Sequence, residues 1–137
     1  MKAAGRFVLD SFALLSYLED ESGADEVQEI LAAAQARRAQ VWMCSINLGE
    51  VLYITEREAS LEAAQAVLAL VDQLPIVVVG PEHPLTLSAA HIKAQHAISY
   101  ADAFAVALAQ ELDGHVVTGD PEFRAVERLV PIKWVGV

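Results

Sequence analysis

Four carboxylates in this sequence stand where a parallel sheet would bring them together. Asp10 directly follows the apolar run FVL, and Asp120 comes shortly after the run HVV. Glu50 lies early in the helical pattern after VWMC, and Asp102 lies at the start of the pattern SYADAFAVALAQ. If these acids converge, two charges about 4 Å apart repel by about 4 kcal/mol at an effective dielectric constant of about 20. Either some of the acids then protonate or a hard divalent cation binds, and oxygen-only ligands suit Mg²⁺ or Mn²⁺.

Each acid taken singly also has a structural explanation. Asp10 can cap the helix that begins FALL, and Asp120 precedes a proline, as an N-cap residue often does. Ser99 and Asp102 match a capping box, in which an acid stands three residues after the capping hydroxyl. Glu50 lies too far into its helix to be a cap, although a solvated helix edge would also accommodate it. The set of four is therefore more informative than its members.

Other catalytic chemistries find less support in the residues. His91 and His96 are five residues apart and so lie on different faces of a helix, and the other two histidines are isolated, which argues against zinc. The sequence has no Gly-x-Ser-x-Gly elbow, no dinucleotide fingerprint and no phosphate-binding loop. A phosphotransferase of the haloacid-dehalogenase type with Asp10 as nucleophile would need a second aspartate where Phe12 stands.

Short apolar runs alternate with helical patterns along the whole chain. The runs are rich in β-branched or aromatic residues and end at breakers, which predicts buried strands. We expect strands at 7–9, 41–44, 76–79, 115–117 and 132–135, and helices at 12–19, 24–38, 47–58, 61–73, 84–96, 100–112 and, in short form, 121–127.

This alternation predicts an α/β fold with a parallel sheet covered by helices on both faces. Residues 1–137 contain no internal repeat or linker, so we expect one domain. Several of the expected helices also have residues typical of helix ends. The expected N-caps are Ser11, Ser45, Ser60 and Ser99, and Gly114 is the expected C′ residue of the helix before it.

Composition limits the class of protein. The chain has 137 residues, of which 55% are hydrophobic and 20% charged, as expected for a globular domain with a packed core. Cys44 is the only cysteine and lies in an apolar run, so we expect a buried, reduced thiol and a cytoplasmic protein. The N-terminus carries Lys2, Arg6 and Asp10 without a long apolar stretch, so no signal peptide or membrane span is expected. A net charge of −10 argues against simple electrostatic binding of a polyanion.

Four segments together resemble a known family. They are FVLDSFALLSYL, SINLGEVLYI, SYADAFAVALA and HVVTGDPEFRAVE, in the order and at spacings typical of small PIN-domain ribonucleases. The resemblance is to the VapC-type toxins of bacterial toxin–antitoxin pairs and extends over almost the whole chain. It implies that an acidic quartet holds Mg²⁺ or Mn²⁺, and the positions that match it are Asp10, Glu50, Asp102 and Asp120.

The resemblance also assigns supporting roles. Thr118 matches a hydroxyl position beside the metal site, and Asn47 is a candidate for orienting Glu50 or contacting substrate. Many relatives have a small residue and then Ser or Asn after the first aspartate, whereas this chain has Ser11 and Phe12. Ser11 either takes over the polar role near the metal or caps its helix, and the cap is favoured.

The fold implied by the family is a five-stranded parallel sheet of order 3-2-1-4-5. The implied activity is endonucleolytic cleavage of RNA by metal-activated water, which leaves 5′-phosphate and 3′-hydroxyl ends. The cation would then bridge an acidic protein and a polyanion. Possible phosphate contacts are Arg124, Arg128, Lys93 and the pair Arg37-Arg38, although a solvated surface is the better reading of that pair.

The family also implies partners. A cognate VapB-type antitoxin would insert a basic residue into the acidic cleft, and the protein would form a homodimer. The Ala- and Leu-rich helices 24–36 and 61–71 can supply an apolar face for the dimer, or they can simply cover the sheet. The alternative function is a catalytically silent PIN-like module that binds protein or RNA without cutting it.

Overall fold

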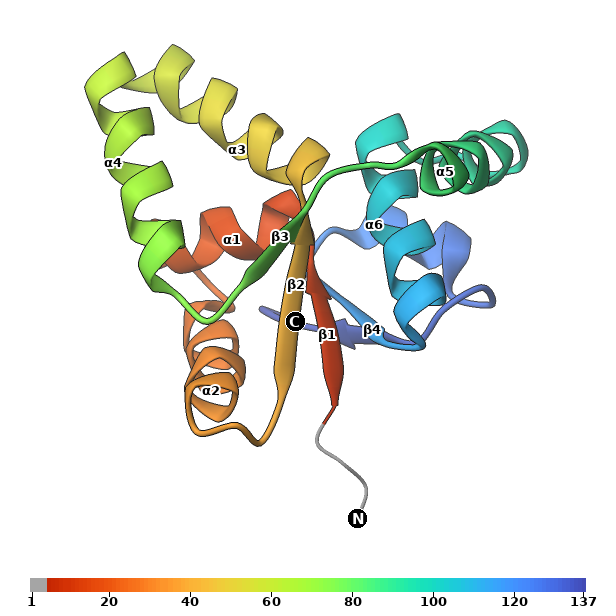
Figure 1. Ribbon diagram of the computed structural model, residues 1–137, viewed down its shortest axis with the longest axis horizontal. Coiled ribbons are helices and arrows are strands. Elements are labelled where there is room, and N and C mark those ends of the chain that lie inside the picture. Colours follow the sequence, from red (N-terminus) through yellow and green to blue (C-terminus); the bar gives the residue numbers. More distant parts are fainter. Residues whose placement is uncertain (1–4) are drawn as a thin grey trace.

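The computed structural model describes residues 5–137, so Lys2 lies outside the described residues. These residues form one parallel sheet of order β3-β2-β1-β4-β5, flanked by helices (Figure 1). The expected fold class and strand order are therefore confirmed. The strands are β1 Arg6–Leu9, β2 Gln40–Cys44, β3 Val77–Val79, β4 His115–Thr118 and β5 Ile132–Trp134.

The helices follow the predicted pattern closely. They are α1 Ser11–Leu18, α2 Ala24–Gln35, α3 Ser45–Glu58, α4 Leu61–Gln73, α5 His83–Gln95, α6 Tyr100–Leu112 and the 3₁₀ helix η1 Pro121–Val126. The helix expected at 24–38 ends at Gln35, because Arg37 takes a left-handed conformation (φ 62°) and the Arg38 N–H turns back to the carbonyl of Ala33. None of the helices between residues 5 and 137 has the length and apolar character needed to cross a bilayer.

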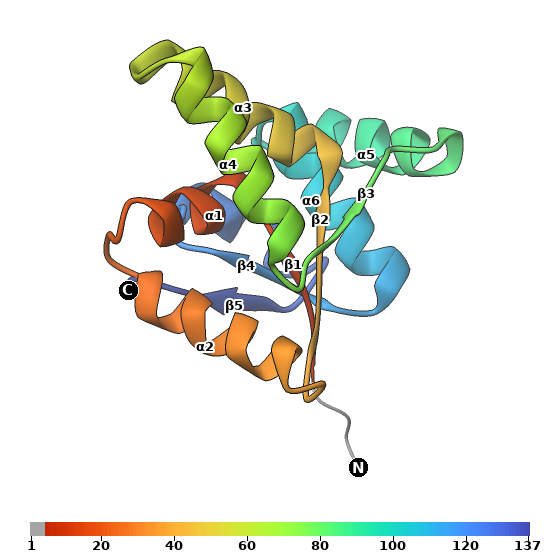
Figure 2. The same cartoon turned by 60° about the vertical axis from the view of Figure 1, so that its left-hand side comes forward.

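Alternate residues of the central strands point to opposite faces of the sheet. Val8 and Val116 pack in one apolar cluster with α5 and α6. Leu9 and Val117 pack in another, with residues of α1 and α2. Figures 1 and 2 show these helices on either side of the strands. Helices α3 and α4 extend the second layer beside β2 and α1 around a third cluster that contains Met43.

Not all of the strands are buried as expected. Val77 and Val78 are 56% and 39% exposed, because β3 is an edge strand that pairs only with β2. The strand expected at 76–79 therefore forms, but the prediction that it is buried is wrong. Cys44, in contrast, is a buried free thiol, as predicted.

Two of the four expected serine caps form. Ser60 Oγ accepts the Ala63 N–H, and Ser99 Oγ accepts the Asp102 N–H. The other two predictions are wrong, because α1 begins one residue and α3 two residues earlier than expected. The N-cap positions of these helices are Asp10 and Cys44, so Ser11 and Ser45 are the first helical residues.

The C-terminus of α6 also differs from the expectation. Asp113, rather than Gly114, adopts the left-handed conformation (φ 55°). Gly114 is needed for a different reason, since a Cβ there would lie 2.7 Å from the carbonyl oxygen of Arg6. A glycine at this position lets the chain enter β4 directly beside β1.

Candidate metal centre

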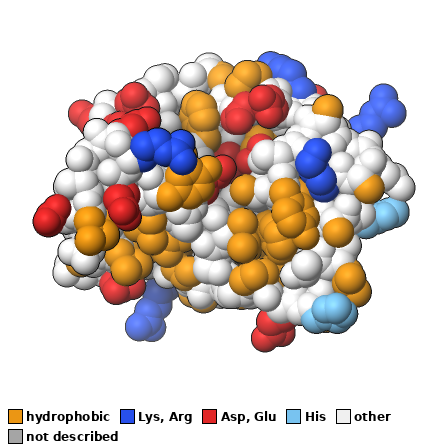
Figure 3. Space-filling model, turned by 90° about the horizontal axis from the view of Figure 1, so that it is seen from above, with side chains coloured by type: hydrophobic (Ala, Val, Ile, Leu, Met, Phe, Trp, Pro, Cys, Tyr) orange, Lys and Arg blue, Asp and Glu red, His pale blue; other side chains and the backbone are white. Residues whose placement is uncertain are grey.

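The candidate site lies at the carboxyl ends of β1, β2 and β4, which are neighbours in the sheet. Asp10 follows β1, Asp120 lies two residues beyond β4, and Glu50 lies in the second turn of α3, which begins where β2 ends. Asp102 comes from the first turn of α6, which packs on the same three strands. Figure 3 looks onto the carboxyl ends of the strands, where acidic side chains lie in a central hollow between apolar patches.

Asp10 is the most deeply buried of these acids, with only 1% of its surface exposed. Its Oδ1 accepts the Ala13 N–H at 2.8 Å, and its Oδ2 is buried without a hydrogen-bond partner. Burial raises the pKa of Asp10 from 3.8 to about 8; the Thr118 side chain and the Ala13 amide lower it in part, and the charges of Asp102 and Asp120 raise it further. An unpaired buried carboxylate oxygen is suited to ligating a cation.

Asp102 combines a helix-start position with burial. Ser99 Oγ accepts its backbone N–H at 3.0 Å, so the cap uses the amide of Asp102. The residue is 8% exposed, and burial raises the pKa of its carboxyl from 3.8 to about 6. Ser99 lowers that pKa in part, while three other carboxylates, those of Asp120, Glu50 and Glu122, raise it. Capping and participation in an acidic cluster are therefore compatible at this residue.

Ser11 connects Glu50 to the start of α1. Its hydroxyl donates to Glu50 Oε1, and the same Oγ lies 3.2 Å from the carbonyl oxygen of Asn47. The fully buried Asn47 donates from Nδ2 to the Ala101 carbonyl oxygen at 3.1 Å, next to Asp102, while its Oδ1 is unpaired. Thus Ser11, rather than the Asn47 side chain, contacts Glu50, and Asn47 ties α3 to the start of α6.

The Thr-Gly-Asp turn after β4 is held tightly. The Thr118 side chain is fully buried, and its Oγ1 accepts the Asp120 N–H at 3.0 Å. A Cβ at Gly119 would lie 2.6 Å from the carbonyl oxygen of Val135, so the turn can approach β5 only with glycine there. Asp120 Oδ1 accepts the Glu122 N–H at 2.9 Å and so caps η1, as the sequence predicted.

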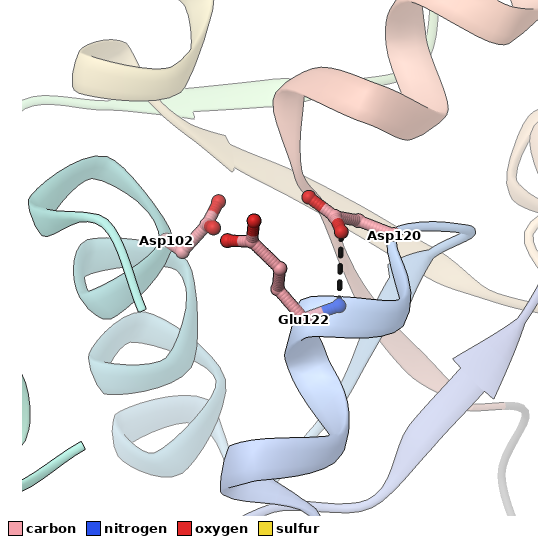
Figure 4. A group of neighbouring side chains, drawn as sticks. All are labelled: Asp102, Asp120 and Glu122. Atoms are coloured by element: carbon pink, nitrogen blue, oxygen red, sulfur yellow. Dashed lines mark hydrogen bonds between the residues drawn. The ribbon is translucent and has the colours of Figure 1, made fainter. Parts of the chain in front are cut away.

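The structure brings two of the expected acids together with one that the sequence reasoning missed. Asp102, Asp120 and Glu122 each offer a carboxylate oxygen, and these oxygens all lie within 4.8 Å of one another (Figure 4). Asp10 and Glu50 are outside this group, although both interact electrostatically with Asp102. A signal for Glu122 was present in the sequence, since it stands in the first turn after the capping Asp120.

The basic residues considered as phosphate contacts lie in different places. The Arg124 guanidinium, in η1 beyond Asp120, stacks over the Trp134 ring at 5.3 Å. Arg37 and Arg38 lie between α2 and the beginning of β2, at the amino ends of the strands, whereas the acids lie at the carboxyl ends. Of these three arginines, Arg124 is the one positioned near the candidate site.

The residues present fit a hard divalent cation. All the donors are carboxylates, which suit Mg²⁺ and Mn²⁺. The charged neighbours that act on the pKa values of Asp10 and Asp102 are also carboxylates, so ionising these groups together is unfavourable. A bound cation would offset this repulsion and would give the unpaired Asp10 Oδ2 a partner.

Comparison with known proteins identifies the family. A sequence model of the PIN domain matches residues 7–129, which is most of the chain. The chain belongs to the PIN-domain family. Among curated proteins, none matches this PIN domain in sequence.

Solved structures share the fold of this PIN domain at low sequence identity. The VapBC2 complex of Rickettsia felis bound to a promoter DNA fragment matches with a TM-score of 0.74 at 14% identity, over 95% of this chain and 98% of the other. VapC20 of Mycobacterium tuberculosis, described as a sarcin–ricin loop cleaving toxin, matches with a TM-score of 0.70 at 20% identity, over 88% and 94%. FitAcB of Neisseria gonorrhoeae matches with a TM-score of 0.64 at 17% identity, over 92% and 95%.

Proposed function

We propose that this PIN domain is a metal-dependent endoribonuclease and the toxin of a toxin–antitoxin pair. The observation that carries the proposal is the acidic cluster at the carboxyl ends of β1, β2 and β4. There Asp10 is buried with an unpaired oxygen, and burial, with a smaller contribution from the charges of Asp102 and Asp120, raises its pKa. A domain without catalytic work would gain stability by replacing such groups with neutral ones.

The structural neighbours support the biological part of the proposal. VapC20 is described as a sarcin–ricin loop cleaving toxin, and several other neighbours are toxin–antitoxin complexes. By extension, we propose that the chain acts in the cytoplasm, binds a VapB-type antitoxin and forms a homodimer. The antitoxin would inactivate the enzyme by placing a basic side chain among the carboxylates, where it would compete with the cation.

The proposed metal ligands are Asp10, Glu50, Asp102 and Asp120, with Mg²⁺ or Mn²⁺ as the cation. When bound, such an ion polarises the scissile phosphate and lowers the pKa of an attacking water, which would leave 5′-phosphate and 3′-hydroxyl ends.

The chain's own residues do the positioning. The Ala13 amide fixes Asp10, and the Ser11 hydroxyl holds the Glu50 carboxylate. Asp120 is only partly buried and is the candidate for orienting the water. Arg124 is the proposed phosphate contact, since it lies in η1, the helix that Asp120 caps, and its stacking on Trp134 leaves N–H groups free to donate.

A single substitution tests the activity. Asp102→Asn keeps the size of the side chain and the Ser99 cap, which uses the backbone, but removes a ligand charge. We expect RNA cleavage in Mg²⁺ or Mn²⁺ to fall by about 100-fold or more. The matched control is Asp113→Asn at the other end of α6, because Asn tolerates the left-handed conformation of that residue. A D102N variant that cuts RNA as fast as the parent would contradict the catalytic assignment.

The alternative, a silent module that binds protein or RNA, predicts different behaviour of the unmodified chain. It predicts no Mn²⁺-dependent rise in thermal stability and no cleavage under any metal condition. The ribonuclease proposal predicts both, because a cation that binds only the folded cluster stabilises the folded state. Thermal unfolding with and without Mn²⁺, followed by a cleavage assay on the same sample, separates the two.

A further inference from the structure

Glu122 occupies a position that the four-acid assignment does not use. It is the second residue of η1, and its backbone N–H donates to Asp120 Oδ1 at 2.9 Å. Figure 4 shows its side chain extending from η1 toward Asp102 on α6, so that the Glu122 carboxylate lies beside the carboxylates of both aspartates. The hydrogen bond to Asp120 thus fixes the position of the Glu122 backbone, and the Glu122 side chain extends from η1 toward α6.

The separation of the three carboxylates is close to that of ligands around one ion. One oxygen from each of Asp102, Asp120 and Glu122 lies within 4.8 Å of the other two. Oxygens about 2.1 Å from an octahedral Mg²⁺ lie at most about 4.2 Å apart. Glu122 is exposed, so small rotations of its side chain can close the remaining difference without moving η1.

A second observation, independent of this grouping, points to a cation at the same place. The Asp10 side chain is almost completely buried, with 1% exposure, and its Oδ2 has no hydrogen-bond partner. Its carboxylate lies close enough to Asp102 and Asp120 for both to act on it electrostatically. Ionising a buried carboxyl beside two further carboxylates is costly unless a cation contacts it.

We propose that Glu122 is a ligand of the cation, in addition to the four acids of the family's quartet. This inference rests on the proposed function, since it concerns the same centre. Glu122 supplies the exposed side of the site, whereas Asp10 supplies the buried side. The Glu122 side chain is exposed and free to rotate, whereas the Asp10 side chain is held by the Ala13 amide.

The test measures metal binding directly, by calorimetric titration of the full chain with Mn²⁺. We expect Glu122→Gln to weaken Mn²⁺ affinity by about tenfold or more, because a neutral amide is a poorer ligand than a carboxylate. The matched control is Glu127→Gln, an exposed acid directly after η1 and outside the cluster, which should bind Mn²⁺ as the parent does. Circular dichroism and thermal unfolding verify that both variants fold.

Measuring Mn²⁺ affinity at high salt distinguishes direct ligation of the ion by Glu122 from a through-space effect of its charge. At about 1 M monovalent salt the Debye length falls to about 3 Å, so the influence of a merely neighbouring charge is screened. We expect the loss in the Glu122→Gln variant to persist there. A loss that disappears in high salt, or an affinity equal to that of the parent, would overturn the assignment of Glu122.

The outcomes also distinguish this inference from the proposed function. If the parent binds Mn²⁺ and cleaves RNA while Glu122→Gln binds equally well, Glu122 is not a ligand and the ribonuclease proposal stands. If the variant binds Mn²⁺ more weakly but the parent cleaves no RNA, the ligand assignment stands and the activity is wrong. A parent that binds no Mn²⁺ overturns both.

Discussion

Asp10 shows how far one residue of the site departs from what stability alone favours. Its folded pKa of about 8 exceeds the ordinary 3.8, chiefly because of burial. Between these values the folded state keeps a proton that the unfolded chain releases. The contribution of Asp10 to stability is therefore full below about pH 3.8 and is lost as the pH rises through about 8. At about 1.4 kcal/mol per pKa unit, the effect is on the order of a few kcal/mol.

This electrostatic cost makes a prediction for the metal-free protein. In EDTA, the free energy of unfolding of the parent should fall as the pH rises from about 5 to about 8.5, and that of Asp10→Asn should fall less. The Asn variant should therefore gain stability relative to the parent toward pH 8.5. Urea unfolding at several pH values measures the difference, and Asp113→Asn should follow the parent's profile. Parallel profiles for the parent and Asp10→Asn would show that the pKa of Asp10 is not raised.

The start of α6 is the element on which the site depends most directly. Ser99 caps this helix through the backbone amide of Asp102, and Asn47 of α3 donates to the adjacent Ala101 carbonyl. These two contacts set the height and rotation of α6 relative to the sheet edge, and with them the position of the Asp102 carboxylate. The Ser60 cap of α4, in contrast, contacts none of the candidate site residues.

Two cap variants separate stability from positioning. Ser99→Ala and Ser60→Ala each remove a side-chain cap, so each should lower the free energy of unfolding by about 1 kcal/mol. Only Ser99→Ala should also weaken Mn²⁺ binding, since Ser60 follows α3 and lies about 15 Å along that helix from Glu50. Urea unfolding and Mn²⁺ titration on both variants give the comparison. An equal effect on Mn²⁺ affinity would show that the cap does not position Asp102.

At the scale of the whole molecule, the two helices considered for a dimer face, α2 and α4, differ in how much of their apolar surface is exposed. In α2, Val27, Ile30 and Leu31 are buried against the sheet, so this helix covers β1 and β2. In α4, Leu61 and Leu68 are 51% and 41% exposed and are seven residues apart, which places them on one face. The proposed homodimer is therefore better served by α4 than by α2.

The dimer prediction follows from this exposed face of α4. The parent should sediment as a dimer, and the double variant Leu61→Lys with Leu68→Lys should shift it to monomer, because four charges would then lie in the interface. Both leucines are exposed, so folding should persist and can be followed by circular dichroism. Leu87→Lys on α5 is the control, at an equally exposed leucine. Dissociation by Leu87→Lys alone would place the interface on α5 instead.

Local pattern was sufficient for much of the fold. The alternation of β-branched runs and helical patterns predicted the α/β class, and every expected strand and helix forms. The same pattern could not tell a central strand from an edge strand, so the exposure of Val77 and Val78 was missed. Exposure of a strand depends on its neighbours in the sheet and not on its own residues. For the strand order itself, the prediction came from family resemblance, and the structure confirmed it.

For the site, the sequence by itself determined which carboxylates follow strands or open helices, since these positions are local. It favoured Ser11 as a helix cap over a polar role near the metal, whereas Ser11 contacts Glu50, and it overlooked Glu122. Both questions depend on side chains from distant segments meeting across space. Only the tertiary structure, by placing α1 beside α3 and η1 beside α6, decided which oxygens face one another. Burial, and with it the raised pKa of Asp10, is likewise a property of the packed molecule.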